Sequence, residues 1–201
     1  MTNGPIVWID CEMTGLDVET DVLVEVAAVV TDEQLVPLDD GIDIVIAAPT
    51  DLLDAMDPVV VGMHTESGLL GEIPSGTTVA DAQAQLLAYV RRHVPDARKA
   101  PLAGSSVHVD RMFLARYMPE LLEHLHYRII DVSSIKELVR RWYPRVFFNA
   151  PDKRGGHRAL ADIQDSIREL QYYRRTVFVA DPGPTSDQAK AAAVEVDAAA
   201  E

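Results

Sequence analysis

Three short runs of apolar, β-branched residues precede the first helical pattern in this chain, and they limit the folds that it can adopt. Residues 5–10, 22–31 and 42–48 each predict a β-strand. The last two runs are separated by a group of turn-forming residues, which favours an antiparallel meander: Pro37, Asp39, Asp40 and Gly41. Helical and strand patterns then alternate from residue 79 onward, so the sequence predicts an α/β domain with a mixed sheet flanked by helices.

The alternating half of the chain is marked by apolar residues at steps of three and four. These steps predict helices over residues 79–94 and about 158–175, and shorter patterns predict strands at 101–105 and 127–131 and a helix at 109–117. Ser134 and Glu137 form a capping box, so a further helix is expected from Ser134 to just before Pro144. Residues 49–76 are expected to be irregular because they hold many structure-breaking residues: Pro58, Gly62, Gly68, Gly71, Pro74 and Gly76.

The length of 201 residues suits one domain, which we place at residues 1–180. Pro182, Gly183 and Pro184 then interrupt the chain. The remainder, residues 181–201, is acidic and rich in alanine, and it has no large apolar side chain. A frayed helix is one interpretation of this tail, but its composition favours disorder.

The net charge limits the kinds of nucleic acid that the protein can bind, and the cysteine content indicates its cellular compartment. The net charge is −14, and residues 1–180 alone carry 17 basic and 27 acidic side chains, a charge of −10. Such a body disfavours binding of long nucleic acids, which usually requires basic surfaces, and suits a cation site and a substrate with few phosphates. Cys11 is the only cysteine, no signal peptide is evident, and no apolar run approaches the roughly 18 residues of a membrane helix. A cytoplasmic protein is expected.

Asp10 and Glu12 end the first predicted strand. Residues two apart in a strand share a face, so both carboxylates should point the same way while Cys11 points to the other side. Adjacent carboxylates repel each other unless a cation lies between them, and hard oxygen ligands select Mg²⁺ or Mn²⁺. A solvated strand end is the more common explanation of an isolated pair of this kind, so the pair alone decides nothing.

Three more residues are candidates for the same site: Asp110, His157 and Asp162. Asp110 lies at the start of a predicted helix, where helix capping is the ordinary explanation. His157 and Asp162 are five residues apart, so on one continuous helix they would diverge by about 140°. If His157 instead lies on the Gly155-Gly156 loop, the two side chains can converge on one site.

Taken in order, Asp10-x-Glu12, Asp110 and His157-(x)4-Asp162 resemble the signature of the histidine-containing DEDD exonucleases. The surrounding words resemble oligoribonucleases over about residues 5–178: residues 8–17 (WIDCEMTGLD), His64 to Leu69, Asp110 to Leu121, His126 to Ser133, Lys136 to Leu138 and Ala161 to Arg174. This resemblance implies a ribonuclease-H-like fold and a homodimer that degrades diribonucleotides and other very short RNA. It also implies two divalent metal ions, Mg²⁺ or Mn²⁺, held by Asp10, Glu12, Asp110 and Asp162, with His157 as the general base.

The same resemblance implies substrate contacts. Leu16 would pack on a base, and the 5′ phosphate would be capped by Ser106, Arg128 and Ser133. Tyr127 would reach the partner's site and take part in catalysis there. Many relatives have a tryptophan as the second wall of the base site, where this chain has Val59, and loss of aromatic stacking can cost ~1–3 kcal/mol. Ordinary roles in helix capping, core packing or a solvated strand also suit these positions.

Three other functions can be compared with this one on the sequence. A DNA-proofreading or tRNA-trimming exonuclease would use the same catalytic residues, although the acidic body and the block from Arg128 to Ser133 count against it. A non-catalytic nucleotide-binding or dimerisation module should have lost catalytic groups, yet all five are present. A calcium-binding structural domain would need its ligands clustered in one loop, and the sequence has no such loop.

Overall fold

A computed structural model describes residues 4–154 and 156–199 of the chain. Its centre is a mixed five-stranded sheet with strand order β3-β2-β1-β4-β5. The meander is antiparallel, and β4 and β5 run parallel to β1. The strands are β1 (Ile6–Met13), β2 (Leu23–Thr31), β3 (Ile42–Val45), β4 (Pro101–Gly104) and β5 (His126–Asp131). The predicted mixed sheet is confirmed.

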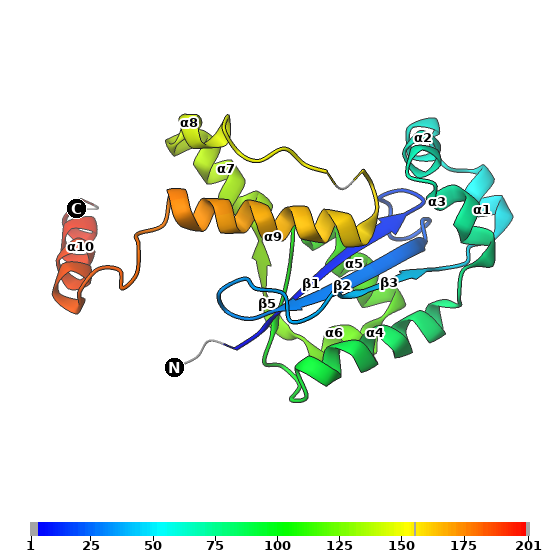
Figure 1. Cartoon of the computed structure of the whole chain (residues 1–201), viewed down its shortest axis with the longest axis horizontal. Coiled ribbons are helices and arrows are strands. Elements are labelled where there is room, and N and C mark those ends of the chain that lie inside the picture. Colours follow the sequence, from blue (N-terminus) through cyan, green and yellow to red (C-terminus); the bar gives the residue numbers. More distant parts are fainter. Residues whose placement is uncertain (1–3, 155, 200–201) are drawn as a thin grey trace.

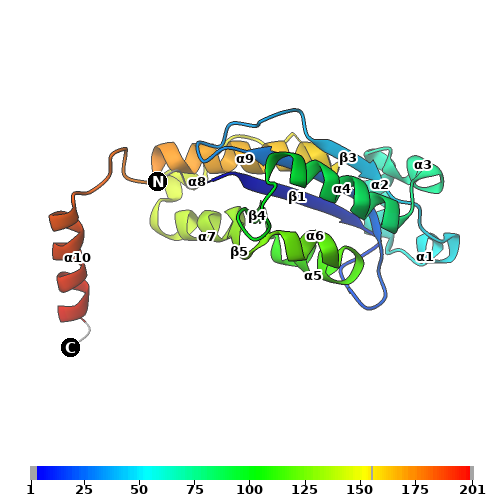
Figure 2. The same ribbon diagram turned by 90° about the horizontal axis from the view of Figure 1, so that it is seen from below.

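Helices cover both faces of the sheet (Figures 1 and 2). One face is covered by α4 (Val79–His93), α5 (His108–Tyr117) and α6 (Pro119–His124). The other face is covered by α7 (Val132–Trp142) and α9 (Ala159–Thr176), and the short α8 (Pro144–Phe147) follows α7. The three layers are those of the ribonuclease-H-like fold that the sequence predicts.

The central strand β1 supplies both cores because its side chains alternate. Val7, Ile9 and Cys11 lie in the core beneath α4 and α5, whereas Trp8 lies in the core beneath α9. The indole Nε1 of Trp8 donates a hydrogen bond of 3.0 Å to Thr31 Oγ1 on β2, so this buried polar group is satisfied. The strand extends three residues beyond the predicted end at Asp10, to Met13.

The prediction of an irregular segment at residues 49–76 is wrong. The segment forms α1 (Thr50–Asp54), α2 (Pro58–Glu66), α3 (Leu69–Glu72) and a 3₁₀ turn, η1 (Ile73–Ser75). Pro58, Gly68 and Pro74 lie at the starts of helices or of the 3₁₀ turn, and Gly62 and Gly71 lie within α2 and α3. Pro58 occupies the first turn of α2, where a missing N–H costs nothing, and Asp57 caps that helix by accepting from the N–H of Val59.

Other element boundaries also differ from the predicted ones. Helix α7 begins at Val132 with Asp131 as its N-cap, so the capping box at Ser134 lies inside the helix. Pro119 and Pro144, expected only to stop helices, also begin α6 and α8. Strand β3 ends at Val45, and Ile46 forms only an isolated bridge with Thr77.

The tail also differs from the disordered segment that we expected, because residues 186–198 form α10 (Ser186–Ala198). Thr185 and Gln188 form a capping box at its start, and alanine has the highest helix propensity, so the helix forms without a core to pack against. All described side chains of α10 are exposed, and the helix lies beyond the end of α9, away from the sheet (Figures 1 and 2). Among the described helices, none combines the length and the apolar character that crossing a membrane requires.

Candidate active site

The strand directions place the predicted metal ligands at one edge of the sheet, whereas Tyr127 and Arg128 lie near the amino end of β5. Strands β1, β4 and β5 run parallel, so their carboxyl ends meet there, and β3 ends at the same edge. The helical segment α1–α3 follows β3 and therefore lies beside these ends (Figure 1). Ligands of open α/β sheets bind at carboxyl ends of strands, so this edge is the natural place for a site.

Asp10 and Glu12 project from the face of β1 that carries Trp8. Both are partly exposed, whereas Cys11 is buried against Val7 and Ile9 in the opposite core. The sequence expectation that the carboxylates share one face and the thiol takes the other therefore agrees with the structure.

Asp110 reaches the site from the opposite helical layer. It lies in the first turn of α5, but its side chain does not serve as the N-cap, a position held by Val107 without a side-chain hydrogen bond. Its Oδ1 instead accepts a hydrogen bond of 2.9 Å from the backbone N–H of Cys11. Asp110 is only 6% exposed. The hydrogen bond holds its carboxylate at the backbone of Cys11, the residue between Asp10 and Glu12.

His157 and Asp162 converge as the loop placement requires. Helix α9 begins only at Ala159, so His157 lies outside it, with φ of 60°. One ligand atom from each of Glu12, His157 and Asp162 can be chosen so that all three lie within 4.8 Å of one another. Gly156 precedes His157 with φ of 65°, and Gly155 lies outside the described residues.

Burial is the main cause that raises the pKa values of the four acidic side chains, and repulsion between carboxylates adds to it for Asp10 and Glu12. Burial, with the charges of Asp110, Asp162 and Glu12, raises the pKa of Asp10 well above its ordinary value. Burial raises the pKa of Glu12 to about 8 and that of Asp110 to about 7, and it also raises the pKa of Asp162. Crowded carboxylates of this kind are stabilised by a divalent cation with hard oxygen ligands, so the residues present fit the metal ions that the family resemblance implies.

His64 connects the helical segment to this cluster. Its Nε2 donates to the carbonyl oxygen of Met13 at 2.9 Å, and its Nδ1 lies 3.9 Å from Glu12 Oε2. The ring is buried, and it holds α2 against the end of β1. Since α2 also carries Val59, His64 fixes one side of the predicted base site relative to the acids.

Leu16 and Val59 are large apolar side chains at the surface, 72% and 70% exposed respectively. The loop before Leu16 is ordered by Asp21, whose carboxylate accepts from Thr14 Oγ1 and from the backbone N–H of Asp17, both at 2.9 Å. Exposed apolar side chains near a site can pack on a flat ligand, which is the use that the resemblance implies for both.

The three predicted phosphate contacts do not all come together. Ser106 Oγ donates to Ser133 Oγ at 3.1 Å, and the backbone N–H groups of both serines donate to Asp131 Oδ1, at 3.0 and 2.8 Å. Arg128 instead contacts Tyr127, with its Nε 3.2 Å from the phenol oxygen and its guanidinium over the ring. The structure therefore groups the two serines and pairs the arginine with the tyrosine.

Sequence reasoning assigned no role to three residues that shape this site. Asp131 organises both serines through backbone hydrogen bonds, and His64 links α2 to β1. Lys153 lowers the pKa values of Asp10 and Asp162 by its positive charge. Asp131 and His64 lie in the words that resemble oligoribonucleases, which was a usable signal, but nothing in the sequence marks Lys153.

Two solved structures with a similar fold are exonucleases by name. The chain is similar to exonuclease I from Methylocaldum szegediense, with 16% identity and a TM-score of 0.63 over 87% of this chain and 41% of that one. It is similarly related to exonuclease I of E. coli in complex with a 5cy-dA13 oligonucleotide, with 15% identity and a TM-score of 0.63 over 86% of this chain and 40% of that one. The chain thus spans about two fifths of the length of these proteins, and the likeness concerns the fold.

Sequence comparisons are more specific. A family model described as an exonuclease, RNase T, matches residues 7–170. The oligoribonuclease of Leifsonia xyli is 60% identical over 95% of this chain and 92% of its own length. The oligoribonuclease of Streptomyces griseus is 61% identical over 98% of both chains. The chain therefore belongs to the oligoribonuclease family of exonucleases.

Proposed function

We propose that this chain hydrolyses very short RNA from the 3′ end, chiefly diribonucleotides, with two divalent ions, Mg²⁺ or Mn²⁺. The observation that carries the proposal is the convergence of Asp10, Glu12, Asp110 and Asp162 at one sheet edge, where burial raises the pKa values of all four and the neighbouring carboxylates raise those of Asp10 and Glu12 further. These four carboxylates are the residues that would hold the ions. The single cysteine, Cys11, agrees with action in the cytoplasm.

Bound metal ions would supply an activated water and charge stabilisation for the leaving 3′ oxygen. His157 would accept the proton of the attacking water, a contribution of roughly 10²–10⁴-fold in rate. Its exposure and its proximity to Glu12 and Asp162 support this role, because a general base must reach both solvent and the reacting centre. Asp110 would hold its ligand orientation through the hydrogen bond from Cys11.

The remaining side chains suggest how short substrates are chosen. Leu16 and Val59 would pack against the bases, and Ser106, Ser133 and Arg128 would close around the 5′ phosphate. The Ser106–Ser133 pair leaves the hydroxyl hydrogen of Ser133 free to donate, and Asp131 holds both backbones in place. Arg128 would have to exchange its contact with Tyr127 for the phosphate.

We further propose that the protein acts as a homodimer in which Tyr127 lies at the partner's site. The edge strand β5 and the 73% exposure of Tyr127 support this arrangement, since an unpaired edge and an exposed aromatic ring are features of contact surfaces. Sedimentation should therefore give a dimer at micromolar concentration. A fully active monomer would remove this part of the proposal.

Length selectivity tests the proposal directly. Turnover is compared on 5′-phosphorylated RNA of two, three, five and seven nucleotides, with single-stranded DNA of the same lengths in parallel. We expect turnover to fall steeply beyond two nucleotides, because a capped 5′ phosphate leaves no room for another residue and the acidic body offers no basic track. Equal rates on RNA of two and seven nucleotides would indicate a general exonuclease, and a preference for DNA would favour a proofreading role.

The matched variant is Arg128→Ala. A hydrogen bond to an ionised group contributes roughly 1.5–3 kcal/mol, so this variant should bind the dinucleotide at least about tenfold more weakly. Metal binding should not change, since Arg128 contacts none of the four carboxylates in the described structure. If selectivity persists and the variant behaves as the wild type, then the cap is formed by other residues.

A further inference from the structure

Arg158, the residue after His157, forms hydrogen bonds with two acidic side chains from distant elements, Glu25 and Glu72. Its Nε donates to Glu25 Oε1 at 2.8 Å, and its Nη2 lies 2.7 Å from the same oxygen. Its Nη1 and Nη2 donate to the two oxygens of Glu72, both at 3.0 Å. A planar guanidinium can satisfy two carboxylates in this way, whereas a lysine ammonium is a point charge without that fixed fork.

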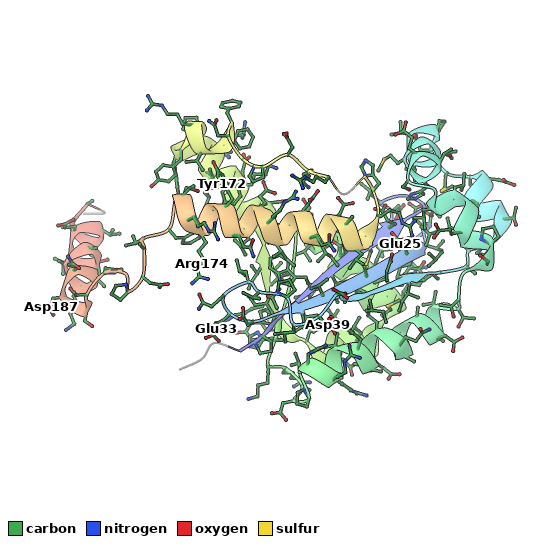
Figure 3. The ribbon with its side chains drawn as sticks, in the orientation of Figure 1. Glu25, Glu33, Asp39, Tyr172, Arg174 and Asp187 are labelled. Carbon is green, nitrogen blue, oxygen red and sulfur yellow. The ribbon has the colours of Figure 1, made fainter. Side chains whose placement is uncertain are left out.

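Glu25 connects this group to the start of α9. It lies on β2, directly opposite Glu12 of β1 in the strand register, and it is fully buried. Its second oxygen, Oε2, accepts from the backbone N–H of Ala159 at 2.8 Å, the first residue of α9. Figure 3 labels Glu25 close to that end of α9. One carboxylate therefore fixes both the helix N-terminus and the arginine that precedes it.

Glu72 connects the same arginine to the helical segment beside the site. It is the last residue of α3, and this segment also includes α2, which carries Val59. His64 independently holds α2 against β1. Arg158 consequently links the elements on one side of the base site to the backbone next to His157.

His157 needs such support because its backbone is unfavourable for its residue type. Its φ of 60° lies in the left-handed region, and its side chain is exposed, so core packing does not fix it. On its N-terminal side the loop is tied to α9 by Asp165, which binds the N–H of Arg154 and the side chain of Arg168. On its C-terminal side the adjacent residue is Arg158.

We propose that Glu25, Arg158 and Glu72 form a positioning clamp that sets the imidazole of His157 relative to Glu12 and Asp162 and couples it to the α2–α3 segment. The three residues act through His157 and do not touch the substrate. This inference rests on the proposed role of His157 as general base. It adds that the placement of this base depends on α3, which contributes no catalytic group itself.

The test is a double-mutant cycle of Glu72→Gln and His157→Ala, measured as single-turnover hydrolysis of a 5′-phosphorylated diribonucleotide. Misplacement of a reacting group by about 1 Å can cost 10²-fold, so Glu72→Gln alone should slow hydrolysis by about 10- to 100-fold. Dinucleotide affinity should stay within about twofold, because the clamp makes no ground-state contact. In the His157→Ala background, Glu72→Gln should have no further effect.

A merely structural role predicts a different result. Loss of folded protein would slow hydrolysis by the same factor in both backgrounds, and that outcome would overturn the clamp. Arg158→Lys separates charge from geometry, because it keeps the positive charge but cannot bridge both carboxylates. We expect it to behave as Glu72→Gln does, and wild-type activity in Arg158→Lys would also overturn the proposal. Arg92→Gln is the control, since it breaks an exposed pair with Asp39 remote from the carboxyl ends of the strands.

A second readout does not depend on activity. The protein has six histidines, so their imidazole NMR signals can be resolved and that of His157 assigned with His157→Ala. In metal-free protein, Glu72→Gln should shift and broaden the His157 signal, whereas Arg92→Gln should not. An unchanged His157 signal overturns the clamp. A wild type that does not hydrolyse RNA overturns the proposed function instead, and the NMR result still decides on the clamp.

Discussion

The metal-free protein should lose stability as the pH rises from about 5 to about 8. Burial raises the pKa of Glu12 from 4.5 to about 8 and that of Asp110 from 3.8 to about 7, and Asp10 shifts in the same direction. The folded state therefore keeps protons that the unfolded chain has already released in this window. Stability falls with rising pH wherever the folded state binds more protons, so the loss is complete only above the folded-state pKa values.

The size of the effect follows from these shifts. One pKa unit corresponds to 1.36 kcal/mol, which gives about 5 kcal/mol for Glu12 and about 4 kcal/mol for Asp110. The two values are not additive, because protonation of Asp110 relieves part of the repulsion that raises the pKa of Glu12, so we use the equivalent of one proton. Entry of water and relaxation of the site reduce this value. In a chain of this length 1 kcal/mol changes Tm by ~2–4 °C, and we expect a fall of roughly 5–10 °C.

Thermal unfolding in the presence of EDTA measures this fall between pH 5 and pH 8.5. Saturating Mg²⁺ or Mn²⁺ should raise Tm most at the alkaline end and flatten the slope, because cations replace the protons as counter-charge. Asp110→Asn retains an oxygen that can accept from the N–H of Cys11 but carries no charge. Its metal-free Tm should exceed that of the wild type at pH 8, with a shallower slope. A metal-free Tm that is constant or rises over this window would refute the reasoning.

Four further outcomes are expected. Replacing Asp162 or another aspartate of the metal site by alanine should leave less than about a tenth of wild-type turnover at saturating metal, with an unchanged circular dichroism spectrum. Val59→Trp should tighten dinucleotide binding about tenfold in calorimetry, because stacking contributes ~1–3 kcal/mol per base. Thr31→Val leaves the buried Nε1 of Trp8 without its acceptor and should cost about 1–3 kcal/mol in urea unfolding. We propose that the catalytic domain ends near residue 180, so truncation there should keep kcat/KM within about twofold, since α10 buries no described side chain.

The fold was predictable where periodicity and burial agree. The strand β2 and the helices α4 and α9 were placed within a residue or two, because each buries a continuous apolar stripe or run. The segment 49–76 was not, since proline and glycine serve equally as breakers and as helix starts, and only tertiary contacts decide between these uses. A helix in the tail was considered but not favoured, because the formation of α10 depends on alanine propensity and a capping box rather than on burial.

The candidate site was predictable only in part. The two-residue spacing of Asp10 and Glu12 and the loop before α9 follow from local geometry, and both agree with the structure. The roles of Glu25 and Glu72 depend instead on strand register and on the docking of α3, which no local pattern contains. Arg128 was grouped with Ser106 and Ser133 by family resemblance, and its partner in the described structure is Tyr127.

The arrangement of the acids has a consequence for how activity depends on stability. Asp10 and Glu12 belong to the central strand, Asp162 belongs to the helical layer on one face, and Asp110 belongs to the layer on the other face. The proposed metal site is therefore complete only when both layers are docked on the sheet. Repulsion among the carboxylates opposes that docking, and the two cores around β1 must outweigh it. Cations that bound only the assembled site would stabilise both layers together, and we expect partial unfolding of either layer to release them and stop hydrolysis.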